Sequence, residues 1–303
     1  MIVRVLGSAA GGGVPQWNCA CANCADARAG RAPRRTQSGL AIAPDDRGPW
    51  LLLNCSPDIA MQVEAFARLH PAQGRSTPLA GVLLTDANLD HVGGLAVLRQ
   101  AGPRPLFRVR SSATVKAICS RQPSFAHFAA APHRWIEVPL DGLASSDGDD
   151  DLVGNRLMVR AFAVPGATPG YDGRRNAAGA VVAYEIADRG SDHRLLFAPV
   201  FGDVDDALAE AVAGAKVAFL DGSFFSDDEL HVTTSVPKSA RSMGHMPVGG
   251  YDGTLARLRN GHGRTIFTHL NNSNPMLDPT SAASATVRDF GAEIAYDGME
   301  VTL

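Results

Sequence analysis

The sequence predicts an α/β fold, a four-layer αββα sandwich of two mixed β-sheets with helices outside, in a single domain spanning residues 1–303. Short apolar runs rich in β-branched residues recur through both halves of the chain, as is typical of strands. Helical patterns lie between some of these runs, and no linker divides the chain. These patterns alone establish one large domain with α and β structure, and the sandwich is an arrangement that accommodates them.

The composition is that of an ordinary globular protein. Of 303 residues, 45% are hydrophobic and 19% are charged, which suffices for a large core. The net charge of −3 gives no reason to expect binding to nucleic acid or to an anionic membrane. No run approaches the roughly 18–20 apolar residues of a membrane span, and the N-terminal stretch has no secretory character. We therefore expect a cytoplasmic protein without a membrane span.

The first half of the chain alternates predicted strands and helices. Strands are predicted at Ile2–Leu6, Gly39–Ala43, Trp50–Leu53, Ala80–Leu84 and Leu106–Val109. Helices are predicted over Asp58–Leu69, which begins with an Asp, and over Ser111–Ser120. The acidic segment at residues 141–151 lacks the regular ligand spacing and closing Glu of a calcium loop, so we interpret it as a solvated surface loop.

The second half repeats this organisation. Strands are predicted at Arg156–Val164, Ala177–Ile186, Arg194–Phe197, Val217–Leu220, Thr265–Thr268, Glu293–Tyr296 and Glu300–Leu303. Helices are predicted at Val204–Ala213, near Gly250–Arg259 and at Thr280–Phe290. Asp203 is interpreted as the residue at which the first of these helices starts.

A polar turn follows the apolar run Ala80–Leu84 and carries Asp86, Asn88, Asp90 and His91. Carboxylates and an imidazole crowded behind a buried strand indicate a metal site, because a cation offsets their desolvation and repulsion. An Asp or Asn in front of a helix also serves as an ordinary N-terminal cap. The residues alone leave both interpretations open.

Three of the five cysteines are close together in the sequence. Cys19, Cys21 and Cys24 can wrap one soft cation, and zinc is the usual metal of a structural sulfur site. The alternative is three small buried residues, since free Cys packs well in cores. The fourth ligand stays open, while Cys55 and Cys119 lie in apolar patterns and are assigned to the core. This usage does not resemble a disulfide framework and fits a reducing compartment.

Two of the nine histidines stand apart from the rest. His269 ends the predicted strand Thr265–Thr268 and leads into Asn271 and Asn272. His245 lies in a Met-Gly-His-Met-Pro segment, where it is either a turn residue or a group that moves protons. Apart from His91 in the polar turn, the other six are interpreted as surface or structural residues: His70, His127, His133, His193, His231 and His262.

The polar turn resembles the first metal motif of the metallo-β-lactamase superfamily, His-x-His-x-Asp-His. Asp86 and Asn88 stand where that motif has its two leading histidines, while Asp90 and His91 keep its end. The resemblance implies that the two-zinc hydrolytic centre is lost and that one metal with open positions remains. The third motif of the superfamily corresponds to residues 164–171, which contain no histidine.

The same resemblance implies a ligand set. His269 corresponds to the last metal ligand, so that Asp90, His91 and His269 would hold the metal, with Asp221 as an additional ligand or a residue behind the ligands. Two histidines and one carboxylate suit non-haem Fe(II), although zinc also fits. Pro199 lies near the position at which members of the superfamily usually have an Asp that bridges the two metals.

Related phosphodiesterases resemble this chain at two further positions. In those that share the cysteine triplet, the fourth zinc ligand lies three residues after the last active-site histidine, which corresponds to Asn272. Asn272 is a poor zinc ligand, so the fourth ligand could also be another His or a water molecule. In phosphodiesterases and transfer-RNA processing enzymes, the histidine that corresponds to His245 shuttles protons.

Six segments together resemble the coenzyme PQQ synthesis protein B family over nearly the whole chain. They are residues 19–24, 86–91, 220–225, 243–247, 269–275 and 296–300. The resemblance implies a role in pyrroloquinoline quinone (PQQ) biosynthesis. It implies either an iron-dependent hydroxylase acting on the tyrosine of a Glu-Tyr unit from the precursor peptide, or a carrier of PQQ or its precursor to the periplasm.

We favour the hydroxylase because a retained ligand set favours chemistry over carriage, and because the lost histidines weigh against a zinc hydrolase or phosphodiesterase. In this hypothesis His245 moves protons, and Asp86 and Asn88 orient water or substrate. Arg174 and Arg175 are either surface residues or contacts for substrate carboxylates. The expected cofactors are structural zinc and an active-site Fe²⁺ or other divalent metal, and the oligomeric state, a homodimer included, stays open.

Overall fold

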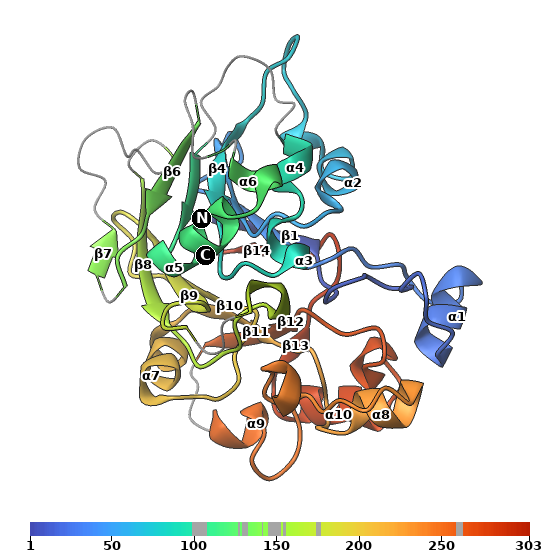
Figure 1. The fold of residues 1–303 in the computed structure, drawn as a ribbon. Coiled ribbons are helices and arrows are strands. Elements are labelled where there is room, and N and C mark those ends of the chain that lie inside the picture. The colour runs from blue at the N-terminus through green and yellow to red at the C-terminus, as the bar shows by residue number, and fades with distance from the viewer. Residues whose placement is uncertain are drawn as a thin grey trace.

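Two seven-stranded β-sheets pack face to face with helices on their outer sides, which confirms the predicted four-layer architecture (Figure 1). The computed structural model describes residues 1–98, 108–126, 128, 133–140, 142–144, 153, 156–173, 177–258 and 263–303. Within these residues, no helix has both the length and the apolar character that crossing a membrane requires.

The first sheet has the strand order β14-β1-β2-β3-β4-β5-β6. Its strands are β1 (Ile2–Gly7), β2 (Gly39–Ala43), β3 (Trp50–Leu53), β4 (Leu79–Leu83), β5 (Arg108–Ser111), β6 (Arg134–Glu137) and β14 (Glu300–Thr302). Pairing is antiparallel from β14 to β3 and parallel from β3 to β6. The chain ends meet here, because the Met1 amine donates a 2.9 Å hydrogen bond to the Leu303 carbonyl.

The second sheet has the order β13-β12-β11-β10-β9-β8-β7. Its strands are β7 (Gly142–Ala144), β8 (Leu157–Ala163), β9 (Val182–Asp188), β10 (Arg194–Ala198), β11 (Val217–Asp221), β12 (Arg264–Thr268) and β13 (Glu293–Ile294). Strands β10 to β13 are parallel, whereas β7 to β10 are antiparallel. Both sheets are therefore mixed.

The helices are short and lie on the outer faces or in the loops. They are α1 (Ala22–Arg28), α2 (Ile59–Glu64), α3 (Leu89–Val92), α4 (Leu95–Leu98), α5 (Ala113–Ser120), α6 (Pro123–Ala126), α7 (Asp206–Gly214), α8 (Glu229–Thr234), α9 (Thr254–Arg257) and α10 (Ala282–Asp289). Helices α2, α4 and α6 lie outside the first sheet, while α7, α9 and α10 lie on the side of the second (Figure 1). Single 3₁₀ turns occur at Ala67–Leu69, Gly170–Asp172, Arg241–Met243 and Pro275–Leu277.

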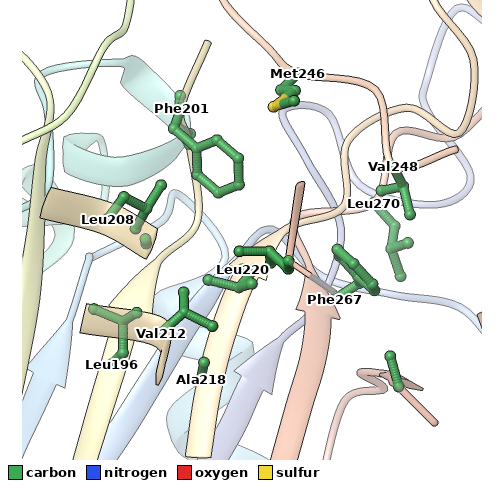
Figure 2. Packing of buried hydrophobic residues seen from close by; sticks show 14 of the residues in the cluster. Leu196, Phe201, Leu208, Val212, Ala218, Leu220, Met246, Val248, Phe267 and Leu270 are labelled. Atoms are coloured by element: carbon green, nitrogen blue, oxygen red, sulfur yellow. The ribbon is translucent and has the colours of Figure 1, made fainter. Parts of the chain in front are cut away.

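Side-chain alternation along the strands divides the buried apolar residues into layers. Val3 and Val5 of β1 join Phe197 and Phe219 of the second sheet in the core between the sheets. Residues that point to the other side pack against the helices. Figure 2 shows this on the second sheet, where Leu208 and Val212 of α7 lie near sheet residues such as Leu196.

Several predicted boundaries are wrong for local reasons. The predicted helix Asp58–Leu69 ends at Glu64, and the extended backbone of Phe66 separates it from a 3₁₀ turn. The strand predicted from Ala177 begins only at Val182, because Gly179 adopts a positive φ of 70° in a preceding turn. The segment 141–151 is not wholly a surface loop, since residues 142–144 pair with β8.

The assignment of Asp203 as a helix start is also wrong. Helix α7 begins at Asp206, and the side chain of Asp205 caps it by accepting a hydrogen bond from the Leu208 amide. Asp203 instead accepts a hydrogen bond from the neighbouring Val204 amide. The rest of the 141–151 segment, Arg174, Arg175, His127 and His262 lie outside the described residues, as does the beginning of the strand predicted at Leu106–Val109.

The strand ends determine where polar side chains gather. The residues that follow β4, β11 and β12 come together at one edge of the sandwich, beside α3. Gly94 follows α3 and packs closely against the loop after β3. A Cβ at this position would lie 2.1 Å from the Ser56 carbonyl oxygen, so only glycine allows this close approach. The segment with α1 extends outward from this edge (Figure 1).

Candidate metal centre and adjoining cavity

Asp90, His91 and His269, the residues that the resemblance implies as metal ligands, lie close together in the structure. Oδ2 of Asp90 lies 3.2 Å from Nε2 of His269 and 3.7 Å from Nε2 of His91. The two imidazole rings meet edge to face with their centroids 5.0 Å apart. Residues 90–91 follow β4 and residue 269 follows β12, so the two sheets each contribute to this cluster.

The orientation of His91 is set by Asp86. Nδ1 of His91 lies 2.6 Å from Oδ2 of Asp86, and both side chains are fully buried. Because an ionised carboxylate only accepts hydrogen bonds, Nδ1 carries a proton, which leaves Nε2 as the nitrogen that can exchange its proton for a cation. Nε2 is buried and has no hydrogen-bond partner among the described residues. Thr85 supports the arrangement by donating a 2.8 Å hydrogen bond to the same carboxylate oxygen.

Asp86 also shapes the turn that carries the cluster. Its Oδ1 accepts hydrogen bonds from the backbone amide and the side-chain amide of Asn88, at 2.9 and 2.8 Å. Asn88 precedes α3 without capping it through its side chain. Asp86 is thus buried behind the cluster, whereas Asn88 lies at the wall of the adjoining cavity.

The cluster stabilises positive charge. Burial alone would lower the pKa of His91, but the carboxylates of Asp86 and Asp90 raise it to about 9. Burial likewise would raise the pKa of Asp90, but His91 and His269 hold it well below its usual range. A site that favours a cationic imidazole between two carboxylates offers the same field to a metal cation.

His269 has an unusual backbone and a defined tautomer. Its φ of 60° lies in the left-handed region, which costs a non-glycine residue about 1–3 kcal/mol and is often found at functional sites. Its Nδ1 lies 2.7 Å from Oγ of Ser223. Ser223 donates its own proton to Oδ1 of Asp221 over 2.6 Å, so Oγ accepts from His269. Nε2 of His269 is therefore the ring nitrogen that faces Asp90, 3.2 Å from Oδ2.

Asp221 lies behind the cluster at the end of β11. Its two oxygens accept hydrogen bonds from the backbone amides of Phe201 and Ser223, in addition to the Ser223 hydroxyl. Oδ2 also lies 2.7 Å from Nδ1 of His245. The oxygens of Asp221, predicted as an additional metal ligand, are thus engaged by groups of the protein.

His245 lies beside the cluster of Asp90, His91 and His269, and its protonated form is stabilised. Its ring stacks on that of His269 at a centroid distance of 5.5 Å. Burial alone would lower the pKa of His245, but the Asp221 carboxylate outweighs burial and raises it. The same contact keeps the proton on Nδ1, and His245 also lines the cavity.

These observations fit a single divalent metal. A buried imidazole nitrogen without a partner is costly unless a further group, such as a cation, satisfies it. The second nitrogen of each candidate histidine ligand is held by a protein acceptor, Asp86 for His91 and Ser223 for His269, which is the usual arrangement behind a metal site. The residues present therefore suit the metal that the ligand set implies.

A cavity of about 470 Å³ opens onto the cluster. Asp90, His245 and His269 face it, as do Ser223 and Phe224, which follow β11. Its other walls come from several loops and include Ala10, Gly11, Asn88, Ala167, Thr168, Pro169, Lys238, Met243 and Asn271. A Cβ on Gly11 would lie 3.3 Å from Oδ2 of Asp90, so glycine keeps this wall close to the cluster.

The motif that has lost its histidine lies in this cavity wall. Ala167, Thr168 and Pro169 are adjacent to the cluster but offer no imidazole. Val200, which follows Pro199, contributes another apolar part of the wall. Ser223, Gly11 and Lys238 were not identified from the sequence, because a lone serine, glycine or lysine carries no ligand-spacing signal.

The three cysteines form a second cluster with Asn272. The amide nitrogen of Asn272 lies 3.0, 3.5 and 3.4 Å from the sulfurs of Cys19, Cys21 and Cys24, respectively. Burial raises the pKa of Cys24 to about 11, and the neighbouring thiols add to this. The three sulfurs lie within 4.8 Å of one another and so fit one soft cation that replaces the thiol protons.

Comparisons with known proteins agree with this architecture. A model of the beta-lactamase superfamily domain matches residues 49–270. Proteins named coenzyme PQQ synthesis protein B from Ruegeria pomeroyi and Methylobacterium sp. strain 4-46 are 36% and 38% identical to this chain, over 100% and 99% of both chains.

Comparison with solved structures also supports this fold. The chain is similar to zinc-bound PqqB from Methylobacterium extorquens, with 36% identity, a TM-score of 0.91 and complete coverage of both chains. It also shares its fold with a diphosphatase of the PhnP family, at 17% identity and a TM-score of 0.66, over 100% of this chain and 97% of the other.

Proposed function

Because the chain belongs to the coenzyme PQQ synthesis protein B family of the beta-lactamase superfamily, we propose that its role in PQQ biosynthesis is that of an iron-dependent hydroxylase. The proposed substrate is a Glu-Tyr unit derived from the precursor peptide, and the tyrosine ring is the part hydroxylated. The proposed metal ligands are Asp90, His91 and His269.

The observation that carries the proposal is the buried Nε2 of His91, which lies beside Asp90 and His269 and has no hydrogen-bond partner in the part of the chain that the structure describes. Two imidazoles and one carboxylate form the ligand set typical of non-haem iron oxygenases. Since Asp90 and His269 line the cavity while His91 is buried beneath it, the open side of the set faces the space available to a substrate. Fe(II) at this position would supply the activation of O₂.

The protein residues around the ligands have separate tasks in this proposal. Asp86 keeps the His91 tautomer with a free Nε2, and Ser223 does the same for His269. Asn88 lies at the cavity wall, where its amide can orient the substrate or water. The apolar Phe224 and Met243 give the tyrosine ring a surface on which to pack.

His245 is proposed to move protons, with Asp221 as its partner. Nδ1 donates to Asp221, so Nε2 is the nitrogen available at the cavity. Hydroxylation of a phenol requires protons to be delivered to and removed from oxygen atoms, and an imidazole of adjusted pKa is suited to this. We therefore assign Asp221 to orientation of His245 rather than to metal ligation.

The cysteine cluster is proposed to hold a structural zinc. In this proposal Cys19, Cys21 and Cys24 supply thiolates, and Asn272, whose side chain contacts all three sulfurs, supplies the fourth ligand. The amide is placed with its nitrogen toward the sulfurs, and a rotation by 180° would present its oxygen to a cation instead. Such a site would fix the α1 segment against the loop that follows His269.

The test begins with the metal content of protein purified without oxygen. Iron-loaded protein is then supplied with the Glu-Tyr dipeptide, O₂ and a two-electron reductant such as ascorbate, so that one oxygen atom enters the ring and the other leaves as water, and oxygen consumption and product mass are measured. We expect about one zinc and one iron per chain, with dipeptide-dependent uptake and a product heavier by oxygen. His269→Ala is expected to lose iron and activity, whereas His193→Ala, at an exposed loop position, is expected to retain both.

The same experiment separates the other functions. Absence of oxygen uptake after iron loading, together with turnover of a simple ester by the zinc form, would favour a hydrolase. Tight binding of PQQ without uptake for any metal would favour a carrier. Full activity in His269→Ala would overturn the ligand set.

A further inference from the structure

One cationic side chain of the cavity is not explained by the metal centre. Among the described residues that line the cavity, Lys238 is the only lysine or arginine. It is exposed, and its ammonium has no ion-pair partner among the described residues. Arg241, three residues later, differs because its guanidinium pairs with Asp252 over 2.8 Å. The side chain of Lys238 is therefore available to a ligand.

The loop that carries Lys238 is anchored to the same turn as His245. The buried Ala240 donates its backbone amide to the carbonyl of Asp227, and the carboxylate of Asp227 accepts from the Arg241 amide. The amide of His245 donates in turn to the Ala240 carbonyl. Lys238 and His245 are thus placed by one hydrogen-bonded segment at the wall of one cavity.

The charge balance of the cavity favours an anionic group on the ligand. Asp90 is the only carboxylate among the described lining residues, and it belongs to the metal cluster. Since the Asp90 carboxylate is assigned to the proposed metal, Lys238 adds a positive charge to a wall whose other side chains are uncharged or histidines. Complementary charge guides a ligand and determines its orientation, even where it adds little affinity.

We propose that Lys238 binds a carboxylate of the ligand and thereby orients an aromatic, carboxylate-bearing molecule with its ring toward the metal cluster. This assignment rests on the proposed function, in which the ligand is Glu-Tyr. PQQ shares the same chemistry, an aromatic system bearing carboxylates, so the test includes both molecules. Lys238 acts in substrate positioning and takes no part in the reaction itself.

The small number of lysines allows a direct test. The chain contains three, Lys116, Lys216 and Lys238. Reductive ¹³C-methylation labels these amines and keeps their charge, so each lysine gives a separate NMR signal. Lys216 is the internal control, because it precedes β11 and so lies at the opposite end of that strand from Asp221. Lys238→Arg assigns the signal by removing it.

The zinc-loaded protein is titrated with Glu-Tyr, with Gln-Tyr, with Glu-Tyr carboxamide and with PQQ. We expect Glu-Tyr to shift the Lys238 signal and to leave the Lys216 signal in place. Gln-Tyr and Glu-Tyr carboxamide each lack one carboxylate, and we expect the one that lacks the carboxylate bound by Lys238 to cause no shift. Lys238→Gln should weaken Glu-Tyr binding about five-fold, more so at low salt, and Lys216→Gln should not. Lys238→Arg should restore binding because it restores the charge.

The outcomes distinguish this assignment from the hydroxylase proposal. Equal Glu-Tyr affinity of wild type and Lys238→Gln would overturn the assignment and leave the hydroxylase untouched. Binding that depends on Lys238 without oxygen uptake by iron-loaded protein would support the assignment and overturn the hydroxylase. Binding of PQQ alone would overturn Glu-Tyr as the ligand, and binding of neither molecule would overturn both proposals.

Discussion

Oδ2 of Asp86 lies 2.6 Å from Nδ1 of His91, and neither side chain is exposed. Asp86 stands where the superfamily motif has a metal-binding histidine. In this chain the Asp86 carboxylate contacts His91, a proposed metal ligand, at the ring nitrogen that does not face Asp90. The carboxylate of Asp86 thus holds Nδ1 of His91 and leaves Nε2 as the ring nitrogen on the side of Asp90.

Asp86→Asn is expected to weaken active-site metal binding about 10- to 100-fold. The asparagine amide can turn either group toward His91, so the tautomer with a free Nε2 is no longer enforced. Metal affinity is measured by competition with a chelator. Asp192→Asn, at an exposed position, is the control. Unchanged affinity in Asp86→Asn would show that the carboxylate does not position the ligand.

Asp221→Asn is expected to change the pH dependence of turnover while metal content stays the same. The carboxylate raises the pKa of His245, so its neutralisation lowers that pKa and moves the corresponding inflection of kcat/KM to lower pH. His245→Gln should lower kcat by about 10²–10⁴ and remove that inflection. Loss of metal from Asp221→Asn would instead support Asp221 as a ligand.

Cys24→Ser is expected to reduce the zinc content by about one equivalent per chain and to loosen the α1 segment, because a serine hydroxyl does not replace a thiolate. Elemental analysis gives the zinc content, and limited proteolysis reports on the segment. Cys55→Ala, a change at a buried cysteine outside the cluster, should keep the zinc. Retention of zinc by Cys24→Ser would contradict the assigned site.

Glu229 predicts a pH dependence of stability away from the metal centre. Its carboxyl is buried and accepts hydrogen bonds from the Phe225 amide and the Ser273 hydroxyl. Burial raises its pKa to about 7, so the folded state binds this proton more tightly than the unfolded state, whose pKa is near 4.5. The resulting stabilisation is complete below about pH 4.5 and is lost as the pH rises through about 7.

Glu229→Gln removes this titration. Its free energy of unfolding should fall less than that of wild type between pH 5 and pH 8, by on the order of a few kcal/mol. Urea unfolding of both proteins at the two pH values, with saturating zinc, measures the difference. Glu210→Gln, on the exposed side of α7, should follow wild type. Parallel behaviour of Glu229→Gln and wild type would refute the raised pKa.

The sequence predicted strands well where apolar runs are continuous and buried on both faces, as at β2, β3 and β11. It failed where a local conformation interrupts the pattern, at Gly179 before β9 and at Phe66 after α2. The cysteine triplet could also be identified from the sequence, because the candidate ligands of this site lie close together along the chain. The roles of Asp221 and Ser223 could not be predicted in this way, because residues such as His245 and His269 are distant from them in the sequence and contact them only in the folded protein.

By itself the sequence determined which residue types are available: two histidines and a carboxylate in the place of a two-metal motif, and three thiols within six residues. The tertiary structure decided which atoms face one another. It placed Asp86 behind His91, put Ser223 between His245 and His269, and left Lys238 at the cavity with no ion-pair partner among the described residues. The reason is that hydrogen-bond geometry and burial select tautomers and contacts, and both depend on where separate strands end in space.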